Sequence, residues 1–199
     1  MSTATTPAPR GRPRDPRRDE AIYDAVITLV AEVGFDRMSL DAVAARAGVS
    51  KPTIYRRCPD GKAQLVAAAI SWRREAKPAQ PDTGSLRGDL LAMVRHLCRD
   101  LTENAHLAAG LTSQLRTSPG LAAIFRDHVI EAERDRWRLV LARAAARGEL
   151  AGPATELFPD VGPSVIHSRM TVGVEPLDDA FAVELVDHVL LPILNPSTP

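Results

Sequence analysis

Two short helical segments joined by a glycine constrain the fold of this 199-residue chain more than any other feature. Ser39 carries a side chain that can accept a hydrogen bond from a free backbone N–H, and the segment after it is predicted to be helical through Ala47. Gly48 can take the left-handed conformation that ends a helix. Ser50 is a second candidate N-cap, and Pro52 suits the first turn of the next helix. The pattern predicts a helix-turn-helix.

Longer helices are predicted on both sides of this motif. Apolar residues recur at spacings of three and four over residues 17–33, and Gly34 is expected to stop that helix. A further helix is expected over residues 62–76, and the two prolines and one glycine of residues 77–85 predict a linker or turn after it.

Apolar periodicity also predicts helices through the second half of the chain. Pro159, Gly162 and Pro163 each interrupt a helix, so the segment that contains them is expected to be short or kinked. Hydrophobic residues make up 45% of the chain and aromatic residues only 4%, which favours packed helices over strands. We therefore predict an all-α fold of about nine helices. The expected later helices cover residues 86–101, 106–116, 121–147, 155–170 and 177–191.

Charge is distributed unevenly, although the net charge of the chain is zero. Residues 1–74 contain 13 Lys and Arg against 8 Asp and Glu, whereas residues 75–199 contain 12 against 17. A basic N-terminal part next to a helix-turn-helix is typical of a protein that binds nucleic acid. Arginines interleaved with proline and glycine predict a flexible basic arm over residues 1–16.

Other classes of protein find no support in the sequence. No apolar run approaches the roughly 20 residues that span a bilayer, and the first residues lack the apolar stretch of a signal peptide, so a cytoplasmic location is expected. Cys58 and Cys98 form no C-x-x-C pair, and the five histidines are scattered. No phosphate-binding loop or nucleophile elbow is present. We expect no metal, no cofactor and no catalysis.

The helix-turn-helix and its flanks resemble the tetracycline-repressor (TetR) family of bacterial transcription regulators. The resemblance rests on Gly34-Phe35, on the block A-x-x-A-G-V-S that ends at Ser50, and on the sequence T-I-Y-R-R that ends at Arg57. It covers roughly residues 17–70. It implies that the protein binds DNA through the second helix of the motif.

The resemblance also implies a domain organisation. A helix-turn-helix DNA-binding domain of three helices would cover residues 17–61, after the basic arm. The bridging helix and linker would cover residues 62–84. Residues 85–199 would form a helical domain that binds an effector and holds two subunits together.

The recognition helix supplies the candidate DNA contacts. Its N-terminal residues would reach base edges in the major groove, where arginine can bond guanine and a threonine methyl can touch a thymine methyl. The resemblance implies phosphate contacts for Thr53, Tyr55 and Lys62; packing of Tyr55 between helices and capping by Lys62 are the alternatives. The arginines of the arm either reach the minor groove or phosphates, or are solvated charge. The candidates are Arg12, Arg14, Ser39, Lys51, Pro52, Thr53, Tyr55, Arg56, Arg57 and Lys62.

Two residues depart from the family pattern between the recognition helix and the next helix. Cys58 stands where an aromatic residue usually closes the small core, and Gly61 is an extra residue before Lys62. A rearranged loop is therefore expected here, which weakens the phosphate role of Lys62 more than the roles in the recognition helix.

Apolar residues of the second half could line an effector cavity, form the dimer interface or simply fill a core. Arg95, His96 and Arg116 lie near the candidate cavity residues in sequence, which suggests a hydrophobic or anionic effector. The cavity candidates are Met93, Val94, Leu97, Leu111, Leu115, Phe125, Val129 and Trp137. The interface candidates are Val165, Ile166, Met170, Phe181, Leu185 and Val189.

These features together predict a homodimeric repressor that reads a palindromic operator in double-stranded DNA and is released by an unidentified small molecule. Activation is the alternative direction of control. A DNA-binding regulator without an effector is the first alternative, and an all-α enzyme with an incidental helix-turn-helix is the second. A cavity beneath the fourth helix would favour the effector hypothesis.

Overall fold

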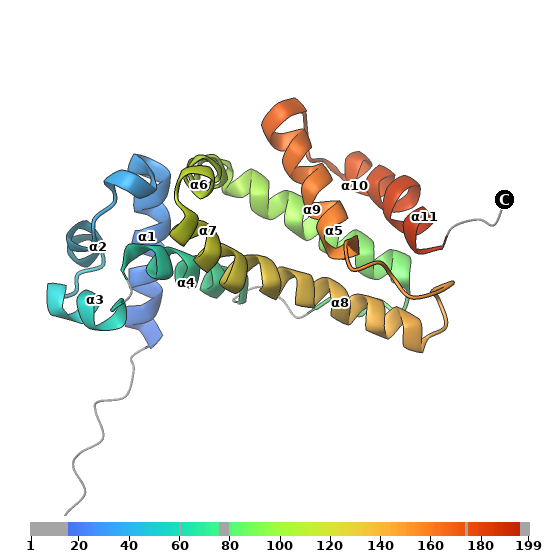
Figure 1. Cartoon of the computed structure of the whole chain (residues 1–199), viewed down its shortest axis with the longest axis horizontal. Coiled ribbons are helices and arrows are strands. Elements are labelled where there is room, and N and C mark those ends of the chain that lie inside the picture. Colours follow the sequence, from blue (N-terminus) through green and yellow to red (C-terminus); the bar gives the residue numbers. More distant parts are fainter. Residues whose placement is uncertain (1–15, 60, 76–79, 174, 196–199) are drawn as a thin grey trace, which may run out of the picture.

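The computed structural model describes residues 16–59, 61–75, 80–173 and 175–195, which form nine helices and no strand (Figure 1). This confirms the all-α prediction. Within the described residues, no helix is both long and apolar enough to cross a membrane.

The first four helices form one group at one end of the molecule (Figure 1). Gly34 has a φ of 80° and interrupts α1, so the predicted break is present, but helical structure resumes to Arg37. The bounds are α1 Pro16–Arg37, α2 Leu40–Arg46, α3 Lys51–Arg57 and α4 Lys62–Glu75.

The two predicted N-caps of the helix-turn-helix behave differently. The Ser39 hydroxyl accepts a hydrogen bond from the backbone N–H of Ala42 at 3.1 Å, as predicted. Ser50 occupies the N-cap position of α3, but its hydroxyl caps no backbone N–H and instead lies 2.8 Å from the Thr53 hydroxyl. The prediction of a side-chain cap at Ser50 is therefore wrong. Gly48 has a φ of 63° in the turn between the helices.

The second half begins with two separate helices and continues with three that each contain a π-helical turn. The first two are α5 Leu86–Glu103 and α6 Ala105–Thr117. The third runs through α7 Pro119–Phe125, η1 Arg126–Ile130 and α8 Glu131–Ala146. The fourth joins α9 Phe158–Ser168 to η2 Arg169–Gly173, and the fifth joins α10 Asp179–Leu185, η3 Val186–Leu190 and α11 Leu191–Leu194.

Helix α9 accommodates all three of its predicted helix breakers. Pro159 lies in the first turn, where its missing N–H is not needed, and Pro163 lies inside the helix. A Cβ at Gly162 would approach the Trp137 ring to 2.9 Å, so the glycine lets α9 lie directly on α8. The helix begins at Phe158 rather than at residue 155 and continues through η2 to Gly173, so it is displaced along the chain and is neither shortened nor broken at these residues.

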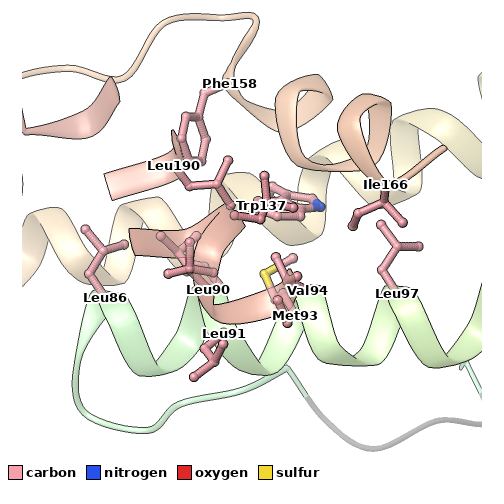
Figure 2. Packing of buried hydrophobic residues seen from close by; sticks show 14 of the residues in the cluster. Leu86, Leu90, Leu91, Met93, Val94, Leu97, Trp137, Phe158, Ile166 and Leu190 are labelled. Carbon is pink, nitrogen blue, oxygen red and sulfur yellow. The ribbon is translucent and has the colours of Figure 1, made fainter. Parts of the chain in front are cut away.

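Two hydrophobic cores hold the helices together. One surrounds Trp137 and is built from α5 and α8–α11, and Figure 2 shows side chains from these helices meeting at the indole ring. The other is built from the first four helices, α1 to α4. Leu107 and Leu111 of α6 and Leu121 of α7 complete it. Helices α6 and α7 therefore pack on α1 and α4, although both follow residue 85 in the chain.

Asp89 is the buried charged residue of the described chain, and it fixes the start of α5. Its carboxylate accepts hydrogen bonds from the backbone N–H of Thr83 at 2.6 Å, from the Thr83 hydroxyl at 2.8 Å and from Arg147 Nη2 at 3.0 Å. Burial alone would raise the pKa of Asp89, but the bonds from Thr83 and Arg147 outweigh it and lower the pKa. The ionised form therefore stabilises the fold.

We expect Asp89→Asn to lower the free energy of unfolding by about 1–3 kcal/mol, because the asparagine NH₂ would face the Arg147 guanidinium or leave a donor unpaired. Because the native pKa is depressed, the Asp89 contribution is present above the unfolded-state pKa of about 4 and is lost as pH falls through the native pKa. Chemical denaturation at pH 7 and at pH 3–4 measures this. The difference in free energy of unfolding between wild type and Asp89→Asn should be smaller at pH 3–4 than at pH 7. Asp82→Asn, at an exposed carboxylate 3.8 Å from Arg147, is the control, and an equal loss there would contradict the assignment.

Candidate DNA-binding surface and effector cavity

Helix α3 is anchored by one buried residue and presents the rest of its surface outward. Ile54 is fully buried against Val43 and Ala44 in the core shared with α2. Lys51, Pro52, Tyr55 and Arg56 are exposed, and Thr53 is half-buried beside Ser50. The predicted groove-reading residues therefore occupy one accessible surface, with Arg57 as the exception.

Asp41 in α2 holds two of these residues. Its carboxylate lies 2.6 Å from Lys51 Nζ and 3.5 Å from the Tyr55 hydroxyl, which donates to it. The hydrogen bond with Asp41 raises the pKa of Lys51. Tyr55 does not pack between helices, because 53% of the residue is exposed.

Arg56 and Arg57 are adjacent in sequence but differ in surroundings. Arg57 forms an ion pair with Asp19 of α1, and only 21% of its side chain is exposed. Arg56 is exposed and forms no ion pair with any described residue. The structure thus places Arg57 at the contact between α3 and α1 and leaves Arg56 at the accessible surface.

Lys62 caps a helix end in the free protein. Its Nζ donates to the carbonyl oxygens of Phe35 and Asp36 at 2.9 Å and of Met38 at 3.4 Å. The same ammonium lies 4.6 Å from the centre of the Phe35 ring. A cation is favourable at the carbonyl end of a helix, so Lys62 fastens the start of α4 to the end of α1. Helix capping is the alternative role that the sequence indicates for Lys62, in place of a phosphate contact.

The two departures from the family pattern fit into this arrangement. Cys58 is 5% exposed and closes the small core, and burial raises the pKa of its thiol. Gly61 has a φ of 89°, a conformation that favours glycine, and its N–H donates to the Cys58 carbonyl at 3.1 Å. The extra residue forms a tight turn that leads into Lys62. Arg12 and Arg14 lie outside the described residues.

A cavity of about 550 Å³ lies between α4 and the helices from α5 to α9. Five of the predicted cavity residues line it: Leu97, Leu111, Leu115, Phe125 and Val129. The rest of its wall is formed by Ile27, Ile70, Arg73, Asp100, Leu101, Asn104, Leu107, Ala108, Thr112, Ile130, Glu133, Arg134, Pro159, Asp160, Pro163, Ser164 and His167. Most of the lining is apolar, and the volume is typical of a small-molecule site.

Three predicted cavity residues lie elsewhere. Met93, Val94 and Trp137 belong to the core between α5, α8 and the last helices, as Figure 2 shows, and do not line the cavity. The three were placed incorrectly because α5 buries two faces, and apolar periodicity does not tell a packed face from a hollow one. The basic residues near the predicted cavity are also outside its wall, and Arg95 pairs with Asp179 instead.

Sequence reasoning missed the cavity residues contributed by α4 and α9. Ile70 and Arg73 are three residues apart on α4, and Asp160, Ser164 and His167 follow one face of α9. The spacing of Leu97, Leu101 and Asn104 on α5 marks the cavity face of that helix. This face could have been recognised in the sequence as a stripe of residues that changes from apolar to polar toward the end of α5.

The predicted interface residues divide into buried and accessible ones. Ile166, Phe181 and Leu185 are buried inside the single chain, so they support the core and are not free to contact a partner. Met170 and Val189 are half-buried, and 36% of Val165 is exposed. The same segments also expose Leu157, Val172 and Ile193.

We expect Lys62→Met to lower the free energy of unfolding by about 1–2 kcal/mol, because three carbonyl oxygens at the end of α1 lose their donor while the apolar stem is kept. Denaturant unfolding measures the stability. Titration of DNA at several salt concentrations tests whether Lys62 contacts a phosphate. If Lys62 acts as a cap, the slope of log K against log[salt] stays unchanged, whereas a slope reduced by about one indicates a phosphate contact.

Comparison with known proteins identifies both halves of the chain. Residues 22–69 match the family model of bacterial regulatory proteins of the tetR family, and residues 80–189 match that of the tetracyclin repressor-like C-terminal domain. An uncharacterized HTH-type transcriptional regulator of Mycobacterium tuberculosis is 33% identical over 193 residues, covering 94% of this chain and 95% of that protein.

Two further matches agree with these. The DNA-binding transcriptional repressor TetR of Mycobacteroides abscessus is 35% identical over 188 residues, covering 92% of this chain and 97% of that protein. The crystal structure of the TetR family transcription regulator SCO0332 superposes with a TM-score of 0.71 at 29% identity, covering 88% of this chain and 97% of that one. The chain therefore belongs to the TetR family of transcription regulators and carries the DNA-binding helix-turn-helix of that family.

Proposed function

We propose that this protein is a homodimeric repressor that dissociates from its operator when a small molecule binds in the cavity. The observation that carries the proposal is the position of α4. This helix begins five residues after the recognition helix, and Ile70 and Arg73 in its later turns line the cavity. An occupant of the cavity therefore touches the helix that supports the DNA-binding motif.

Two sets of contacts connect the cavity wall to the motif. Lys62 joins the start of α4 to the carbonyl oxygens at the end of α1. Gln114 of α6, next to the cavity residue Leu115, donates to Asp36 of α1 at 2.5 Å. A shift of α4 or α6 would therefore move α1 and the helices packed on it. A ten- to hundred-fold change in operator affinity requires only about 1.4–2.8 kcal/mol of coupling.

The dimer follows from the need to read two half-sites with two recognition helices. Val165, Val172 and Ile193 are exposed apolar residues on the last helices, where a two-fold contact would cover them. Similarity to a relative named as a repressor supports repression as the direction of control.

We propose different roles for the two arginines of α3. We expect Arg56→Ala to lower the preference for the operator over unrelated DNA about ten- to hundred-fold, because a bidentate guanine contact is lost. Arg57→Ala should lower stability instead, since Arg57 pairs with Asp19. Footprinting on DNA upstream of the protein's own coding sequence, followed by anisotropy titrations, measures the operator preference, and denaturant unfolding measures the stability.

Arg138→Ala is the matched control, because Arg138 is a half-exposed arginine on α8. Absence of any footprint would overturn the repressor proposal. A footprint whose specificity survives Arg56→Ala would overturn the assignment of Arg56 to base reading.

A further inference from the structure

The charged residues of the cavity wall are not equivalent. Arg134 is fully engaged: its guanidinium forms two hydrogen bonds with Asp160, at 2.8 and 2.6 Å, and a third with Glu131 at 2.6 Å. The bonds from Arg134 also hold the pKa of Asp160 below its ordinary value. This group of three charges spans α8 and α9 and already compensates itself.

The other two carboxylates of the wall also have partners. Asp100 accepts a hydrogen bond from the Asn104 side chain at 3.1 Å, and Glu133 accepts one from the Trp137 indole N–H at 3.2 Å. Both take part in further interactions within the chain. Neither carboxylate therefore depends on a ligand for its hydrogen bonds.

Arg73 differs from all of these. It is half-buried at the cavity wall, and none of the described residues forms an ion pair or hydrogen bond with its guanidinium. Water can solvate it while the cavity is empty of ligand. An apolar occupant displaces that water, and a cation that loses its solvent without gaining a partner is costly. An anionic group on the occupant would remove this cost and form charge-assisted hydrogen bonds with the planar guanidinium.

We propose that the effector is an apolar molecule with one anionic group, and that the anion pairs with Arg73. This rests on the cavity being the effector site proposed above. The apolar wall of α5, α6 and α7 receives the body of the molecule, and α4 receives its charge. The strongest new contact is then made on the helix that begins just after the recognition helix. Arg95, His96 and Arg116, which suggested an anion from sequence, lie outside the wall.

A matched pair of dyes tests the charge preference. 1-Anilinonaphthalene-8-sulfonate and N-phenyl-1-naphthylamine share one aromatic skeleton and differ by the sulfonate, and the fluorescence of both rises in apolar sites. Each is titrated into the full chain as wild type, Arg73→Gln, Arg73→Lys and Arg116→Gln. Arg116 is an exposed arginine of α6 outside the cavity wall, so its variant controls for general loss of positive charge.

We expect the sulfonate to bind the wild type about ten-fold more tightly than the neutral dye. Arg73→Gln should remove that preference while the neutral dye still binds, which also shows that the variant is folded. Arg73→Lys should keep part of the preference, and Arg116→Gln all of it. Equal binding of the two dyes to the wild type, or a preference that survives Arg73→Gln, would overturn the proposal.

Operator release is measured separately, so that the two proposals can fail separately. A sulfonate preference that depends on Arg73 supports the anionic ligand class even if the dye leaves operator affinity unchanged. An unchanged operator affinity would count only against the proposal that the ligand releases the operator. Operator release by both dyes alike would support release and overturn the anionic class.

Discussion

The contacts of α4 at both of its ends are the constraint on which the account depends. At its start, Lys62 donates to three carbonyl oxygens around the end of α1, and Leu65 and Val66 are buried in the core of the DNA-binding motif. Two turns later, Ile70 and Arg73 face the cavity. Because both sets of contacts lie on one helix of 14 residues, we expect a displacement at the cavity to reach the motif. Gln114 on α6 gives the cavity a second connection to α1.

The DNA-binding surface is balanced by acidic residues in the same unit. Asp41 holds Lys51 and Tyr55, and Asp19 holds Arg57, so three of the predicted contacts already have partners in the free protein. Arg56 has none among the described residues. Lys51 and Tyr55 lie at the surface, and in the proposed complex they would exchange Asp41 for phosphate, whereas Arg57 is held where α3 meets α1. The same acidic residues reduce the attraction of the surface for DNA of any sequence, because that attraction depends on the number of unpaired cations.

Much of the fold was predictable because its signals are local. Gly34, Ser39 and Gly48 specify breaks, caps and turns through their own backbone chemistry, and the helices follow from apolar spacing. The prediction of a side-chain cap at Ser50 was wrong because its hydroxyl forms a hydrogen bond with the neighbouring Thr53 hydroxyl instead. Trp137 and Ile166 were misassigned for a different reason: an apolar residue reads the same in sequence whether it fills a core, lines a cavity or faces a partner. The role of Arg73 depends on which charges the fold brings near it, and no spacing along α4 reveals that.

The central claim is that filling the cavity weakens operator binding, and it can be tested without knowing the effector. Ala108 lines the cavity, whereas Ala109, the next residue of α6, is exposed and does not. Ala108→Trp should fill part of the cavity, and Ala109→Trp adds the same side chain to the surface. We expect an operator dissociation constant about ten-fold higher for Ala108→Trp than for Ala109→Trp. A folded Ala108→Trp variant that no longer admits a fluorescent ligand and yet binds the operator as tightly as Ala109→Trp would contradict it.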